Sequence, residues 1–160
     1  MVKIDSKIRF RDALENDTDS LTDLVVRLKR LNEEFDSMLK VRDDIREQAR
    51  TYVSKAIKDK NCIVLVVESE GKVIGLLKAD LRERFFNEPA TEGRIIEFYI
   101  MPEFRKHEVG TELMRLALDK MKHKGVKIVS AEFPSQNKIS VEFYAKQGFR
   151  PITNIHAKML

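Results

Sequence analysis

Residues 98–114 read FYIMPEFRKHEVGTELM, and this stretch decides the fold. It begins as an apolar strand, passes through Pro102 and continues as an amphipathic helix. The turn between the two carries Arg105, and Gly110 follows near the start of the helix. A turn that leads into a helix offers free backbone N–H groups and the positive end of the helix dipole, which together bind phosphate. The sequence therefore predicts an anion site between this strand and this helix.

The neighbouring segments extend this stretch into a strand–helix–strand unit. Strands are predicted over 94–101 and 127–133, with a helix over 109–124 between them. Two strands joined by a helix form a parallel pair with a right-handed crossover. Residues 137–149, NKISVEFYAKQGF, predict a further short helix over 138–147 that ends at Gly148.

The remaining elements complete a chain of alternating strands and helices. A strand over 7–14 precedes two amphipathic helices, the first with leucines at helical spacing from Leu21 and the second over 43–59. Strands over 62–68 and 73–81 form a hairpin, 82–93 is a loop, and 152–160 is a last strand. The predicted class is α/β (α+β), a mixed, mostly antiparallel sheet with one parallel βαβ unit and helices on both faces. We expect a single domain over 1–160.

Composition limits the class of protein. The chain has 160 residues, of which 42% are hydrophobic and 35% charged, and no apolar run reaches the length of a membrane span. Cys62 is the only cysteine, which predicts a buried thiol and a cytoplasmic location. The net charge of +4 favours anionic partners, but basic and acidic residues alternate, which argues against nucleic acid. His107, His123 and His156 lack metal-ligand spacing, so no metal is expected.

Two motifs resemble the GCN5-related N-acetyltransferase (GNAT) superfamily. The family signature is Arg or Gln, two residues, Gly, one residue, and then Gly or Ala; Arg105 and Gly110 match it, while Glu108 replaces the first glycine. Asn137, Tyr144 and the pair Gly148-Phe149 match the family's second motif. The resemblance implies the acyl-CoA N-acyltransferase fold. It also implies transfer of an acetyl group from acetyl-CoA to a primary amine (a polyamine, a small amine, or a peptide or protein amine) by direct attack in a ternary complex.

The resemblance also implies a set of residues that bind the cofactor. The backbone of the signature turn is expected to hold the pyrophosphate, the preceding strand to line the pantetheine arm, and the N–H of Ile100 to polarise the thioester carbonyl. The implied cofactor-binding residues are Phe98, Tyr99, Ile100, Arg105, Lys106, His107, Glu108, Val109, Gly110, Thr111, Asn137 and Tyr144. The alternative role of Asn137 is to cap the following helix. The carboxylate of Glu108 repels a pyrophosphate, and this residue lacks the freedom of glycine at positive φ.

Three residues are candidates for catalysis. Tyr144 matches the family's tyrosine that gives a proton to the departing sulfur; its alternative role is a core aromatic beside Phe143. Glu97 in the central strand and Glu132 before Asn137 are the candidate bases, and each is alternatively half of an ion pair.

Acceptor selection and the type of activity stay open at this stage. Segments 33–42, 82–91 and 153–156 are expected to select the acceptor, and Phe35, Met38 and Leu39 either touch it or pack on the core. The acids there form either a cation-attracting mouth or ordinary solvated charges: Glu33, Glu34, Asp36, Glu83 and Glu88. The alternative function is a non-catalytic acyl-CoA-binding module on the same fold. Homodimers are common in the family, so a homodimer also stays open.

Overall fold

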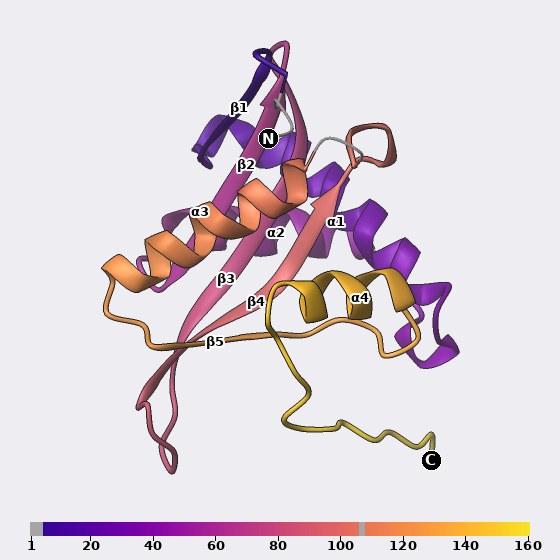
Figure 1. Cartoon of the computed structure of the whole chain (residues 1–160). Helices are drawn as coiled ribbons and strands as arrows, with labels where there is room; N and C mark the ends of the chain where they lie inside the picture. The colour runs from indigo at the N-terminus through magenta and orange to yellow at the C-terminus, as the bar shows by residue number, and fades with distance from the viewer. Residues whose placement is uncertain (1–4, 106–107) are drawn as a thin grey trace.

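A computed structural model describes residues 5–105 and 108–160 (Figure 1). Short 3-10 turns at Glu15–Asp17, Ser37–Leu39 (η2) and Pro102–Phe104 lie between the main elements. The main elements in chain order are β1 (Ile8–Asp12), α1 (Thr18–Glu33), α2 (Ile45–Lys58), β2 (Cys62–Ser69), β3 (Lys72–Glu83), β4 (Thr91–Ile100), α3 (Val109–His123), β5 (Ile128–Ala131) and α4 (Lys138–Lys146). None of the described helices is long and apolar enough to cross a bilayer.

The strands form one mixed sheet, as the sequence predicts. Their order is β1-β2-β3-β4-β5, with every neighbouring pair antiparallel except β4 and β5, which are parallel. Helices α1 and α2 cover one face, and α3 and α4 lie on the other side (Figure 1). The predicted fold class is therefore confirmed.

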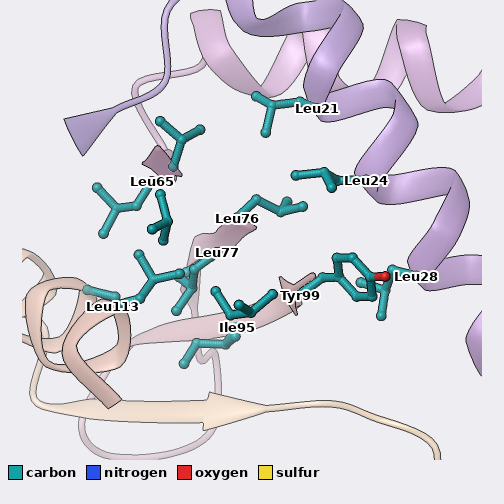
Figure 2. Close-up of a cluster of buried hydrophobic side chains, with 14 of the residues drawn as sticks. Leu21, Leu24, Leu28, Leu65, Leu76, Leu77, Ile95, Tyr99 and Leu113 are labelled. Carbon is teal, nitrogen blue, oxygen red and sulfur yellow. The ribbon is translucent and has the colours of Figure 1, made fainter. Parts of the chain in front are cut away.

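The core lies on both sides of the sheet because each strand alternates its side chains between the two faces. Leu24 of α1 points toward Leu76 of β3, while Leu113 of α3 points toward Leu77 (Figure 2). All four side chains are almost completely buried. Each such burial contributes roughly 1.5–3 kcal/mol, so the apolar faces of the helices hold them on the sheet.

The pairing of β4 with β5 is short, and this positions the site. The two strands pair only where Glu92–Ile95 lies beside Ile128–Ala131, and the N–H of Glu132 then donates to the carbonyl of Ile95 at 3.1 Å. On its other edge β4 pairs with β3 up to Ile100, with a register shift that leaves Ile96 as a bulge. A bulge bends a strand and increases its twist. The end of β4 therefore leaves β5 and opens the sheet between them.

Two boundaries differ from the sequence prediction. The hairpin strands β3 and β4 extend into 82–93, so only 84–90 forms the loop. The predicted last strand over 152–160 is wrong: these residues have no strand and are exposed. The local sequence is compatible with an extended backbone. A strand also needs a neighbouring strand to pair with, and a local pattern does not specify that neighbour.

Core and tail substitutions test this arrangement. We expect Leu77→Ala to lower the free energy of unfolding by about 2–5 kcal/mol, because it leaves a cavity in a fully buried layer. Ile155→Ala is the matched control, since this side chain is 89% exposed, and it should change the free energy of unfolding by less than about 0.5 kcal/mol. Urea titration measures both. An equal decrease in the free energy of unfolding of the two variants would contradict either the burial of Leu77 or the exposure of Ile155.

Candidate functional site

A cavity of about 440 Å³ lies at the carboxyl end of β4. Both motif segments contribute to it, together with the end of β5 and the second half of α1. The predicted site residues that line it are Phe98, Tyr99, Ile100, Arg105, Glu108, Gly110, Thr111, Glu132, Asn137 and Tyr144. Val109 instead lies fully buried in the core, and the predicted residues Lys106 and His107 lie outside the described residues.

The backbone of β4 turns two of its N–H groups toward this cavity. Met101 donates its N–H to the carbonyl of Ile74 at 2.9 Å, which makes them a hydrogen-bonded pair of the β3–β4 ladder. Along antiparallel strands, hydrogen-bonded pairs alternate with pairs that are not hydrogen-bonded. The residue before Met101, Ile100, therefore directs its N–H and C=O away from β3. The same holds for Phe98, two residues earlier. Both face the side where β5 no longer pairs.

Arg105 secures the turn that follows β4. Its Nε donates to the carbonyl of Ile100 at 2.8 Å, and its guanidinium lies 5.3 Å from the centre of the Tyr99 ring. The side chain therefore fastens the turn to the strand end and satisfies the C=O of Ile100, whose N–H points away from β3. Gly110 lets α3 approach this strand closely, since a Cβ there would lie 3.3 Å from the Phe98 ring.

Glu108 occupies a backbone conformation that favours glycine. Its φ is 55° and its ψ is 14°, in the left-handed region, and it is the N-cap of α3 without a side-chain capping bond. The conformation is unfavourable for a residue with a Cβ by roughly 1–2 kcal/mol. The exposed side chain lines the cavity at the helix N-terminus. The structure thus retains the geometry of a glycine position and fills it with a carboxylate.

Tyr144 both packs in the core and lines the cavity. Its ring stacks on Phe133 with centroids 4.7 Å apart, and the rings of Phe143 and Phe149 meet it edge-on. Burial raises the pKa of the phenol above its usual value, so the hydroxyl is protonated at neutral pH. That hydroxyl has no hydrogen-bond partner among the described residues. It is a proton donor without an acceptor in the described part of the chain.

Asn137 caps the helix that carries Tyr144. Its Oδ1 accepts the N–H of Ser140 at 3.1 Å, which satisfies one of the free donors at the start of α4. The capping role foreseen from the sequence is therefore present. Because Asn137 also lines the cavity, it fixes the orientation of α4 at the cavity wall.

Glu97 lies on the opposite face of the sheet from Phe98, under α1 and α2. Its side chain is nearly inaccessible, and its Oε1 accepts Lys29 Nζ at 2.7 Å and the Tyr52 hydroxyl at 3.0 Å. Its second oxygen, Oε2, is buried without a partner among the described residues. Glu97 does not line the cavity, although Tyr99, two residues along the same strand, does. The ion-pair alternative for this residue is therefore realised.

Glu132 is the candidate base that the cavity reaches directly. Its side chain is 49% exposed, and the cation nearest to it in the described ranges, Arg94, lies 4.0 Å away. An ion pair at this distance and exposure stabilises a fold very little. The Glu132 carboxylate is therefore available to a ligand in the cavity.

The acidic mouth, one of the two alternatives for these acids, does not form as a single group. Glu33 accepts the N–H of Val41, and Asp36 accepts that of Met38, so both hold the segment after α1 in place. Glu83 and Glu88 lie in or beside the β3–β4 loop, at the far end of β4 from Ile100. For these two acids the alternative of ordinary solvated charges is realised, because both are exposed and the full length of β4 separates them from the cavity.

Sequence reasoning did not assign one wall of the cavity. Leu28, Leu31 and Asn32 of α1 line it, and Phe35 follows from the adjoining segment. The leucines have the helical spacing that is typical of core residues, so their spacing does not indicate that they also line the cavity. Phe35 was one of the apolar residues with two open roles, and the structure places it in the wall. In the described part of the chain, no group of three or more potential metal ligands gathers anywhere.

The chain belongs to the acetyltransferase (GNAT) family, whose model matches residues 25–149. An uncharacterised N-acetyltransferase of Methanocaldococcus jannaschii is 30% identical over 104 residues, which cover 65% of this chain and 46% of that protein. The chain spans about half the length of the curated relatives that it matches.

Solved structures share the fold at low sequence identity. Aminoglycoside N-acetyltransferase AAC(6')-Iy, solved in complex with CoA, has a TM-score of 0.78 and 14% identity, over 96% of this chain and 94% of that one. A predicted acetyltransferase of Clostridium acetobutylicum, solved with acetyl-CoA, has a TM-score of 0.75 and 15% identity, over 95% and 96% of the two chains. At these identities the likeness establishes the fold.

Two substitutions at Glu108 separate backbone strain from charge. Glu108→Gly and Glu108→Ala both remove the carboxylate, but only glycine also relieves the left-handed conformation. We expect the glycine variant to be more stable than the alanine variant by about 1 kcal/mol, measured by urea unfolding without ligand. Equal stability of the two variants would show that the turn carries no strain at this residue.

Proposed function

We propose that this chain is an N-acetyltransferase that moves the acetyl group of acetyl-CoA to a primary amine, within a ternary complex of both substrates. The observation that carries the proposal is the cavity that the N-terminus of α3, the strand end at Ile100 and the ring of Tyr144 line together. Family membership and the CoA-bound structures of the same fold support it. The lone thiol of Cys62 supports a reducing, cytoplasmic location. A homodimer is a further part of the proposal that the family suggests.

The lining of the cavity fits acetyl-CoA. The N-terminus of α3 at Gly110 and Thr111 offers backbone N–H groups and a dipole to the pyrophosphate. The edge of β4 at Phe98 offers its outward backbone groups to the amides of the pantetheine arm, in the manner of an added strand. Phe133 and Phe143 supply an apolar boundary. Glu108 is the one unfavourable residue at the phosphate end.

The chain's own groups supply the proton transfers of the reaction. A neutral amine nitrogen attacks the thioester carbon, so that a C–N bond forms, the C–S bond breaks and the amine loses a proton. The N–H of Ile100 stabilises the negative charge that develops on the carbonyl oxygen. Tyr144 gives its proton to the departing sulfur.

The amine proton needs a base, and the two candidates differ in access. Glu132 lies in the cavity wall and is the base that we favour. Glu97 is the second candidate, with its unpartnered Oε2 able to act only through water. A non-catalytic acyl-CoA-binding module is the alternative function, and Glu108 in place of glycine is the observation that favours it.

Calorimetric titration tests cofactor binding. We expect micromolar binding of acetyl-CoA and CoA to the wild-type protein. Glu108→Gly should bind about 2–5-fold more tightly, because a carboxylate at a helix N-terminus is worth roughly 0.3–1 kcal/mol and here opposes a pyrophosphate. Absence of binding in both proteins would reject acetyl-CoA as the ligand. Binding by the glycine variant alone would mean that Glu108 closes the phosphate site.

Amine-dependent release of CoA tests catalysis. We expect Tyr144→Phe to lower kcat by about 100-fold, and Glu132→Gln by a similar factor, with CoA affinity unchanged. Glu142→Gln on the exposed face of α4 is the control and should keep full activity. If the wild-type protein binds CoA but releases none with any amine, the non-catalytic alternative holds. A larger loss in Glu97→Gln than in Glu132→Gln would transfer the role of base to Glu97.

A further inference from the structure

We propose that the acceptor is a single primary amine carried on an uncharged, apolar body, and not a polyamine. This inference rests on the proposed function, because it concerns the part of the same cavity that the acceptor would enter. The wall formed by α1 and the segment after it carries the argument, together with the charges along the cavity.

The wall in question is apolar. Leu28, Leu31 and Phe35 provide it, with Asn32 as its one polar residue and no charged residue among them. Across the cavity, α4 adds Ile139, whose side chain is largely exposed. An apolar group of the acceptor that enters here is removed from water, at roughly 25 cal/mol for each Å² buried.

Among the described residues, the charges that line the cavity provide for one ammonium group only. They are Arg105, Glu108 and Glu132 among the described residues. Arg105 is a cation held on the carbonyl of Ile100, and Glu108 lies at the N-terminus of α3, at the phosphate end. Glu132 is therefore the carboxylate that remains for an acceptor cation.

The neighbouring acids do not provide further carboxylates for an acceptor cation. Glu97 is buried and already paired with Lys29, so the two neutralise each other. Glu33, Glu34 and Asp36 lie at the end of α1 and in the segment after it, but none of them lines the cavity. A polyamine would bring further ammonium groups to an apolar wall, where an unpaired cation loses its hydration without compensation. The wall therefore selects against additional positive charge.

Two sources carry the favoured chemistry, namely free arylalkyl or alkyl amines and the N-termini of peptides that begin with apolar residues. The probes are 2-phenylethylamine for the first, the peptide amide Met-Leu-Phe for the second, and spermidine as the polyamine. CoA release gives kcat/KM for each probe, and calorimetry gives its affinity with and without CoA. We expect at least one apolar probe to exceed spermidine by about 10-fold or more in both measurements.

Asn32→Asp tests the wall itself. It places a carboxylate in the otherwise uncharged wall without changing its shape, so the ratio of spermidine to 2-phenylethylamine in kcat/KM and in affinity should rise by about 5–10-fold. Asn61→Asp, exposed just before β2, is the matched control and should leave this ratio unchanged. Phe35→Ala should weaken the apolar probes about 10-fold and spermidine little. Thermal unfolding confirms that each variant folds.

The outcomes separate this inference from the function on which it rests. Spermidine that equals or exceeds both apolar probes, or a ratio unchanged by Asn32→Asp, overturns the inference while CoA release still supports acetyl transfer. CoA binding without amine-dependent release overturns the proposed function, and the affinities of the probes for the CoA-loaded protein then still decide the class of amine. The more active of the two apolar probes identifies the source.

Discussion

The limited pairing between β4 and β5 is the constraint on which the rest of the structure depends. The bulge at Ile96 bends β4 after four paired residues, while its other edge stays bonded to β3 as far as Ile100. Backbone N–H groups at this end thus face an opening in place of a strand. Because unpaired backbone groups away from water are unfavourable, such an edge is suited to a ligand that supplies the missing partners.

The two faces of the sheet have different roles: one contributes residues to the cavity, and the other holds α1 and α2 on β4. On one face α3 and α4 bring the signature turn and Tyr144 to the opening. On the other face Glu97 binds Lys29 and Tyr52, so that a buried carboxylate joins α1, α2 and β4. Removing one partner of a buried charge is strongly destabilising. This cluster therefore fixes α1 where its apolar wall meets the cavity.

Glu108 combines two opposing physical effects at one residue. Its carboxylate suits the positive end of the α3 dipole, yet its backbone adopts a conformation that favours glycine and its charge opposes a bound phosphate. Glu108 therefore combines a favourable interaction of its charge with the helix dipole and an unfavourable backbone conformation.

The sequence by itself determined the order of the elements from β1 to α4, the parallel βαβ unit and the two motif segments, because hydrophobic periodicity, turn residues and motif spacing are local properties. It also placed most of the residues that line the cavity. Only the tertiary structure decided that Glu97 lies under α1 while Glu132 lies in the cavity, that Glu83 and Glu88 are remote, and that 152–160 forms no strand. Each of these depends on strand pairing, on a bulge, or on which face a helix covers. Such relations join residues far apart in the chain, so a local pattern does not contain them.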